Sequence, residues 1–166
     1  MKFLKYIFVG CLLLLFISFT DEQTALSSEG LSEGNTAPDF SMSDLSEKLN
    51  LSDYKGNFVL VNFWAAYDAR SRENNVILWN EVKRINKKDV AMVSVSFDEF
   101  ESIFKETVKI DGIDQTTQFF DEKGENSDLY KKYRLQKGFT SYLLDKSGRI
   151  IAKGVTPDDL KRLPKS

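Results

Sequence analysis

The sequence FVLVNFWAAYDARSRE, residues 58–73, joins a short apolar run to the start of a polar segment and decides the fold class. The run Phe58–Trp64 is almost continuously apolar and follows the turn sequence Lys55-Gly56-Asn57, which is typical of a strand buried on both faces. Over residues 71–85, apolar side chains then recur at three-residue steps, which predicts an amphipathic helix. A buried strand that leads directly into a helix indicates an α/β protein.

The rest of the chain continues this alternation of strand and helix. Further strands are expected at 91–97 and 117–120, further helices at 100–108, 127–133 and 157–163, and a closing hairpin at 140–144 and 149–153. The helix at 100–108 is predicted to face the core with Phe100, Ile103, Phe104 and Val108. Together these elements predict a mixed central β-sheet with helices on both faces.

The N-terminal residues 1–20 have the composition of an export signal or a signal anchor. Two lysines precede an apolar run of about 14 residues, shorter than the roughly 20 that a membrane span needs. Cleavage near Thr20 and retention of residues 3–19 as a membrane anchor both stay open, as does lipidation at Cys11, which follows Val9-Gly10. We therefore expect an exported protein, periplasmic or on the extracytoplasmic face of a membrane, with any membrane contact through this segment.

Residues 21–35 are acidic and rich in Ser and Gly, without an apolar period. This composition predicts a flexible tether that would hold a domain roughly 20 Å from a membrane. The folded domain is expected over residues 36–166, starting near Ala37.

The composition excludes several function classes. The chain has no His, which rules out Ser-His-Asp, Cys-His and HExxH sites, and its net charge of −2 argues against nucleic-acid binding. Its nine glycines form no phosphate-binding loop, and the acidic stretch Asp121–Asn126 lacks the ligand spacing of a calcium loop, so we expect a surface turn there. No cofactor and no metal site are expected.

Four blocks of sequence, in order and spacing, resemble one family. Ala37–Phe40, Leu51–Gly56, Val59–Ala65 and Tyr142–Ile151 are similar to successive blocks of the TlpA/ResA branch of the thioredoxin-like (AhpC/TSA-redoxin) superfamily. The resemblance covers residues 37–163 and implies a thioredoxin-like fold. Proteins of that branch are exported or membrane-tethered bacterial thiol-disulfide oxidoreductases, and several serve cytochrome c maturation.

The resemblance also exposes what this chain lacks. Where the family has the two cysteines of WCxxCR, this chain has Asp68 and Ser71, and where the family has a cis-proline, it has Phe139 after Gly138. A carboxylate forms no disulfide, and a hydroxyl stays protonated where a thiol would ionise. The single cysteine of the chain lies in the N-terminal segment, so we expect no catalytic residue for thiol-disulfide exchange.

Binding residues are instead expected around the degenerate positions. Asp68 is predicted to cap the following helix, with a ligand-binding carboxylate as the alternative. Arg70 and Arg72 flank it as a cationic rim or as merely solvated side chains. The family fold implies that Tyr67 and Phe139 lie side by side on the surface that holds a client, although an inward-facing Phe139 stays open.

The expected function is that of an exported or membrane-tethered protein-binding or scaffold module without redox activity. Its partner would be an envelope protein or peptide that the sequence does not identify. The alternative is a role in the oxidoreductase family's own processes, cell redox homeostasis or cytochrome c maturation, that depends on the cysteines of a partner protein.

Overall fold

The computed structural model describes residues 28–43, 48–85, 88 and 90–164 of the chain. The predicted signal segment, Cys11 and the tether up to residue 27 lie outside the described residues. No helix in the described part of the chain combines the length and the apolarity needed to cross a bilayer.

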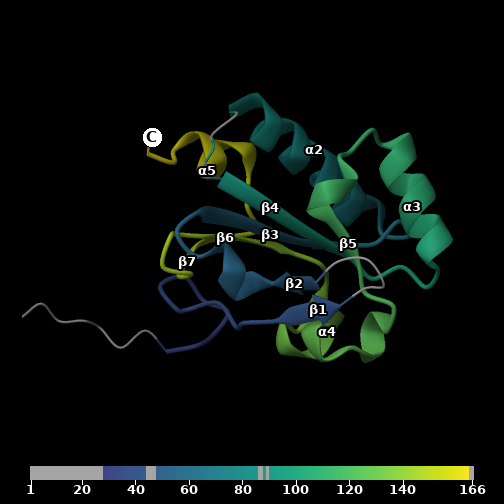
Figure 1. Cartoon of the computed structure of the whole chain (residues 1–166), viewed down its shortest axis with the longest axis horizontal. Coiled ribbons are helices and arrows are strands. Elements are labelled where there is room, and N and C mark those ends of the chain that lie inside the picture. The colour runs from purple at the N-terminus through teal and green to yellow at the C-terminus, as the bar shows by residue number, and fades with distance from the viewer. Residues whose placement is uncertain (1–27, 44–47, 86–87, 89, 165–166) are drawn as a thin grey trace, which may run out of the picture.

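A five-stranded mixed sheet forms the centre of the fold, in the order β5-β4-β3-β6-β7 (Figure 1). The central strand β3 (Phe58–Trp64) pairs in parallel with β4 (Val90–Ser96), which pairs in parallel with β5 (Gln118–Phe120). On its other side, β3 pairs antiparallel with β6 (Ser141–Leu144), and β7 (Ile150–Lys153) completes the hairpin. The predicted mixed sheet and closing hairpin are confirmed, and the central place of β3 explains its continuous apolar run.

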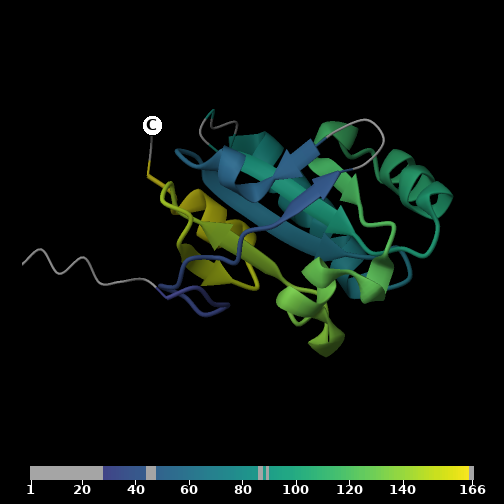
Figure 2. The same cartoon turned by 60° about the horizontal axis from the view of Figure 1, so that its bottom comes forward.

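Helices cover both faces of this sheet, as predicted (Figures 1 and 2). One face carries three helices: α2 (Ala69–Ile85), α3 (Glu101–Ile110) and α5 (Pro157–Lys161). The opposite face carries α4 (Asp128–Lys132) and a small antiparallel sheet of β1 (Ser41–Ser43) and β2 (Lys48–Asn50). The sequence did not predict β1 and β2, because strands of three residues are too short to show an alternating pattern.

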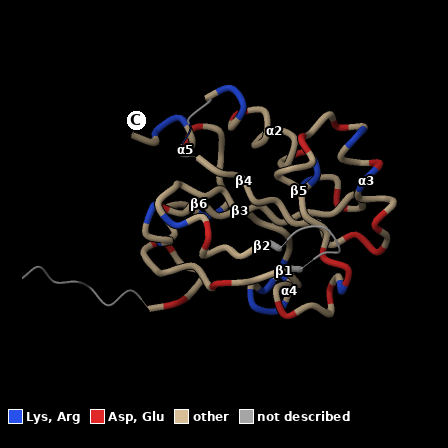
Figure 3. The backbone as a smooth tube through the Cα atoms, in the orientation of Figure 1, with Lys and Arg blue, Asp and Glu red and all other residues tan. Residues whose placement is uncertain are grey.

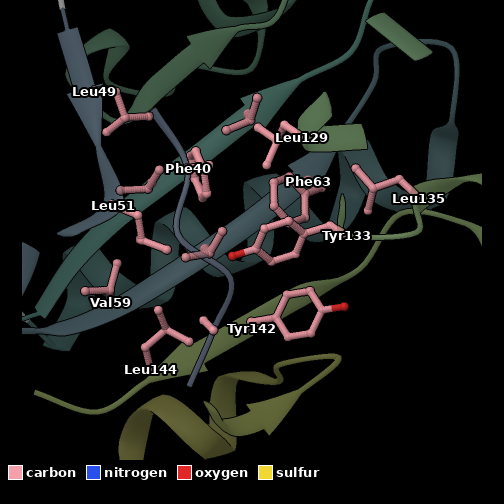
Figure 4. Close-up of a cluster of buried hydrophobic side chains, with 14 of the residues drawn as sticks. Phe40, Leu49, Leu51, Val59, Phe63, Leu129, Tyr133, Leu135, Tyr142 and Leu144 are labelled. Atoms are coloured by element: carbon pink, nitrogen blue, oxygen red, sulfur yellow. The ribbon is translucent and has the colours of Figure 1, made fainter. Parts of the chain in front are cut away.

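The larger apolar core lies between the sheet and α4 and is rich in aromatic side chains (Figure 4). The ring centroids of Phe63 and Tyr133 are 4.7 Å apart, and Phe40 meets Tyr133 edge-on at 5.8 Å. The buried hydroxyl of Tyr133 donates to the carbonyl oxygen of Pro38 at 2.7 Å. This bond satisfies the polar end of the ring and fastens the chain before β1 to the end of α4.

The face under α2 holds two apolar clusters with a buried polar group between them. One cluster contains Leu60 of β3 and the other contains Trp64 of the same strand, and Asn62 lies between these two residues. The Oδ1 atom of Asn75 on α2 accepts from Asn62 Nδ2 at 3.0 Å and from Ser94 Oγ at 2.7 Å. Its Nδ2 atom donates to Gln118 Oε1 at 3.0 Å. Directional bonds therefore fix the position of α2 on the sheet, in addition to apolar packing.

The segment 28–36 is hydrogen-bonded to the β6–β7 hairpin, which corrects the prediction of a flexible tether up to residue 35. The backbone N–H of Gly34 donates to the carbonyl of Ile150 at 2.8 Å, and the N–H of Ile150 donates to the carbonyl of Asn35 at 2.9 Å. Figure 2 shows this segment running beside the hairpin. Backbone pairing of this kind requires no apolar side chains, so a polar sequence does not reveal it.

The core face of α3 is narrower than the sequence predicted. Phe104 and Val108 are buried as expected, but Phe100 is 55% exposed and Ile103 is 44% exposed. Phe100 is the N-cap residue with an extended backbone, so it precedes the helix and does not share its periodicity. The prediction that Phe100 and Ile103 belong to the core is therefore wrong.

Candidate functional site

The loop between β3 and α2 places Asp68 at the N-terminus of α2. The Oδ1 atom of Asp68 accepts a hydrogen bond from the backbone N–H of Ser71 at 2.7 Å, and its carbonyl oxygen accepts from the N–H of Arg72 at 3.0 Å. These are the two bonds of an N-cap residue, and the carboxylate lies where the helix dipole favours negative charge. The predicted capping role of Asp68 is confirmed.

Ser71, at the second degenerate position, has a structural environment as well. Its side chain is buried, its hydroxyl donates to the carbonyl of Asp68 at 3.1 Å, and its Oγ atom accepts from the N–H of Ala65 at 3.3 Å. The hydroxyl thus links the end of β3 to the first turn of α2. Both positions that carry sulfur in the TlpA/ResA pattern are occupied here by oxygens that hold the local backbone.

A buried carboxylate that the sequence analysis missed supports the same loop. Asp98, which follows β4, is 2% exposed, and its Oδ1 accepts from the N–H of Ala66 at 2.8 Å. Its Oδ2 accepts from the hydroxyl of Ser96 at 2.7 Å. Parallel strands β3 and β4 end at the same edge of the sheet, so an acid directly after the second strand was the available indication. Asp98 positions the backbone that precedes Tyr67.

Tyr67 and Phe139 lie side by side, as predicted, with ring centroids 6.2 Å apart. Tyr67 is 63% exposed, whereas Phe139 is half-buried. Phe139 stacks on Phe97 at 6.0 Å and meets Tyr130 edge-on at 6.3 Å. Phe139 is therefore neither fully exposed nor fully inward: its ring packs on the core aromatics Phe97 and Tyr130 and also contacts Tyr67.

The charge around Tyr67 is acidic. Partial burial raises the pKa of the Tyr67 hydroxyl, and the nearby carboxylate of Glu125 raises it further. The phenol therefore stays protonated at neutral pH and is available as a hydrogen-bond donor at the surface.

A groove of about 420 Å³ runs between the first turns of α2 and the loop before β6. Three of the predicted binding residues, Asp68, Arg70 and Phe139, line it together with Ser71. Tyr67 does not line the groove but adjoins it through its contact with Phe139. Residues 137–141 also line the groove, and Gly138 among them has a φ of 113°, which favours glycine. We call this hollow the site groove.

Arg70 and Arg72, expected to form a cationic rim or to be merely solvated, have different environments. Arg72 Nε and Nη2 donate to the two carboxylate oxygens of Asp111 at 2.9 and 2.6 Å, and this pairing raises the pKa of the guanidinium. Asp111 comes from the end of α3, which the sequence could not place beside α2. Arg70 is exposed, whereas Asp111 holds Arg72, so neither of the two alternatives, a cationic rim or a merely solvated side chain, describes Arg72.

The acidic stretch Asp121–Asn126 forms a turn, as expected, but its first residue is buried. The Oδ1 atom of Asp121 accepts from the N–H of Lys123 at 3.0 Å, and burial raises the pKa of its carboxyl group. The described residues contain no cluster of three or more His, Cys, Asp or Glu side chains placed to hold a metal ion.

Comparison with known proteins gives a consistent set of relatives. The AhpC/TSA family model matches residues 34–153. The thioredoxin-like protein YneN of Bacillus subtilis is 36% identical over 154 residues, which cover 89% of this chain and 88% of YneN. The thiol-disulfide oxidoreductase ResA of Bacillus cereus is 31% identical over 138 residues, which cover 81% of this chain and 77% of ResA.

Solved structures show the same relationship. A thioredoxin-like protein from Parabacteroides distasonis superposes with a TM-score of 0.71 at 45% identity and covers 82% of this chain and 96% of its own. A thiol-disulfide oxidoreductase from Bacteroides fragilis superposes with a TM-score of 0.67 at 28% identity, covering 78% of this chain and 100% of its own. The chain therefore belongs to the AhpC/TSA family, with a thioredoxin-like fold and ResA-type thiol-disulfide oxidoreductases among its relatives.

Proposed function

We propose that this protein is a binding module that holds a polypeptide partner in the site groove and performs no thiol-disulfide exchange of its own. The observation that carries the proposal is the bonding of Asp68 and Ser71. Exchange needs a thiolate to attack and a second sulfur to resolve the mixed disulfide. Here the first position is a helix-capping carboxylate and the second is a buried hydroxyl with two backbone partners.

The surface around the lost dithiol is well built for binding. Tyr67 is exposed beside Phe139 and Arg70 lines the same groove, and aromatic and Arg side chains are the usual hot spots of interfaces. Asp98 fixes the loop before Tyr67, while Phe97 supports the ring of Phe139. A surface fixed in this way loses little conformational entropy when a partner binds.

The proposed location is the extracytoplasmic side of a membrane, because residues 1–20 have the composition of an export signal or anchor. The partner would then be an envelope protein or peptide. The relatives named thiol-disulfide oxidoreductases support the alternative, a redox role in which a partner supplies the cysteines. That alternative requires a disulfide substrate and electron transfer, whereas binding requires neither.

Site-specific photo-crosslinking in native membranes tests the proposal. Tyr67→p-benzoylphenylalanine places a photoreactive group beside the site groove, and Ile151→p-benzoylphenylalanine is the matched control, because Ile151 is an exposed apolar residue on β7. We expect discrete crosslinked products from position 67 that are absent from position 151. They should persist when accessible thiols are blocked with an alkylating agent.

A second substitution shows whether the groove itself is used. Adding Arg70→Gln to the photoreactive variant should weaken the crosslinked products, because Arg70 lines the groove and has an exposed side chain. The same products from position 151, or none from position 67, would contradict the proposed function. Products that vanish on thiol alkylation would favour the redox alternative.

A further inference from the structure

A second groove, of about 660 Å³, lies on the other side of the loop that borders the site groove. One wall is the N-terminal segment between Glu29 and Pro38, and the other comes from the end of α4 and from strands β6 and β7. Four residues of the loop, 137–140, line both hollows. One extended polypeptide crossing this loop can therefore occupy both grooves.

The second groove is basic, although the chain as a whole carries a net charge of −2. Its lining includes four cations, Lys132, Arg134, Lys137 and Lys153, against the single carboxylate of Glu29. Figure 3 shows basic positions beside α4 and beside β6 in this part of the fold. We call this hollow the basic groove.

The charges of the basic groove are not neutralised within the described part of the chain. Lys132 Nζ donates to the backbone carbonyl of Asp39 at 2.7 Å, and Lys153 Nζ lies 5.6 Å from the ring centroid of Tyr142. Among the described residues, no carboxylate forms an ion pair with Arg134, Lys137 or Lys153. The groove therefore presents positive charge, while Tyr133 and Tyr142 in its lining are almost fully buried.

Arg134 occupies a backbone position that normally selects glycine. Its φ of 55° and ψ of 41° are left-handed, and it is the one non-glycine residue with positive φ in the described ranges. Arg134 directly follows Tyr133, the C-cap residue of α4. Glycine is the usual residue at the position after a helix C-cap. Arg134 and Tyr142 both line the groove, and the charge of Arg134 opposes the rise that burial causes in the pKa of Tyr142. An arginine at a site suited to glycine indicates a use for its side chain.

The geometry points to an acidic segment of the polypeptide partner, rich in Asp or Glu, as the occupant of the basic groove. This inference rests on the proposed function, because the same partner would cross the shared loop 137–140 from the site groove. Carboxylates would pair with Arg134 and Lys137, the two lining cations whose side chains have no hydrogen-bond, ion-pair or ring partner among the described residues. A nucleic acid is disfavoured by the net negative charge of the protein, which would repel a long polyanion outside the groove.

Binding of two fluorescent peptides to the full chain in mild detergent tests this inference. Each peptide has about 12 residues and therefore an extended length of about 40 Å. Both peptides begin with the same aromatic half, which is followed by four Glu in one peptide and by four Gln in the other. The Arg134→Gly/Lys137→Gln variant removes both charges, and glycine suits the left-handed backbone at position 134. The Lys83→Gln/Lys109→Gln variant is the matched control, because these cations are exposed on α2 and α3, away from the groove.

At about 50 mM salt, the wild-type protein should bind the Glu peptide about tenfold more tightly than the Gln peptide. The preference should disappear in Arg134→Gly/Lys137→Gln and remain in Lys83→Gln/Lys109→Gln. Equal affinity of the wild type for both peptides, or a preference that survives the Arg134→Gly/Lys137→Gln substitutions, would overturn the inference. A different pattern would also overturn the inference: the wild type binds vesicles containing phosphatidylglycerol, the Arg134→Gly/Lys137→Gln variant loses this binding, and neither peptide is preferred.

Tyr67→Ser separates this inference from the proposed function. If the site groove works and the basic groove does not, both peptides bind equally and Tyr67→Ser weakens both. If only the basic groove binds the peptide, Tyr67→Ser keeps the preference for the Glu peptide and its affinity is unchanged. This result would contradict the proposed function and support an independent site for acidic peptides.

Discussion

Asn75→Ala removes the side chain that bonds to every other member of the buried polar group under α2. Asn75 is 0% exposed, and its amide bonds to Asn62, Ser94 and Gln118 at 3.0, 2.7 and 3.0 Å. After the substitution, Asn62 Nδ2 still donates to Ser94 Oγ at 3.0 Å. Three groups lose their partners: the second Nδ2 hydrogen of Asn62, the hydroxyl proton of Ser94 and the Oε1 atom of Gln118.

The expected loss follows from these three unsatisfied groups. Each buried polar group left without a partner costs about 1–3 kcal/mol, so we expect Asn75→Ala to lower the free energy of unfolding by about 3–9 kcal/mol. Domains of this size are stable by only about 5–15 kcal/mol, so the change would be large. Asn80→Ala is the control, because Asn80 is exposed on the same helix and the exchange removes the same atoms.

Urea denaturation followed by circular dichroism measures both variants. Asn80→Ala is expected to change stability by less than about 0.5 kcal/mol, or to raise it slightly, since Ala is a better helix former. The m-value should stay the same in the two variants if only the native state is affected. A loss below about 1 kcal/mol for Asn75→Ala would mean that water replaces the missing amide and that these buried bonds do not stabilise the fold as described.

Three further predictions concern charged groups. Asp68→Ala should lower the free energy of unfolding by about 0.5–2 kcal/mol, and Asp68→Asn by much less because Asn also caps helices; a large loss for Asn in urea denaturation would show that the charge matters. A double-mutant cycle of Arg72→Gln and Asp111→Asn should give a coupling energy of about 1 kcal/mol that falls at high salt, and zero coupling would contradict the paired geometry. Hydrogen bonds from Thr156 lower the pKa of Asp159, so the stability it contributes is present above the ordinary pKa of about 3.9 and is lost as pH falls through the lowered value. Asp159→Asn should therefore reduce the fall in the free energy of unfolding as the pH is lowered. An unchanged pH dependence would contradict the proposed contribution of Asp159.

The fold was predictable because its main signals are local. The apolar run of β3, the three-residue steps of α2 and the turn between β6 and β7 each lie within one short stretch of sequence. The capping role of Asp68 was predictable for the same reason, since its partner Ser71 is only three residues away. Local patterns fail at the ends of helices, and this is why Phe100 was placed in the core.

The rest of the site depends on residues that only the folded chain brings together. Ala66 and Asp98 are separated by 32 positions in the sequence, and Arg72 and Asp111 by 39. No periodicity links such pairs, so the bond between Arg72 and Asp111 could not be predicted, and the support of the loop by Asp98 was indicated only by an acid after the second parallel strand. Polar segments that pair through their backbone, such as residues 28–36, leave equally little pattern in the sequence.

Dithiothreitol-driven reduction of insulin tests whether the protein lacks thiol-disulfide exchange activity of its own. The full chain with Cys11→Ser is compared with the same chain carrying Asp68→Cys and Ser71→Cys, which restores a dithiol at the start of α2. We expect the chain without the dithiol to give the background rate at every protein concentration. A reduction rate that rises in proportion to the concentration of this chain would show that the protein catalyses exchange without a dithiol and would contradict the proposed function.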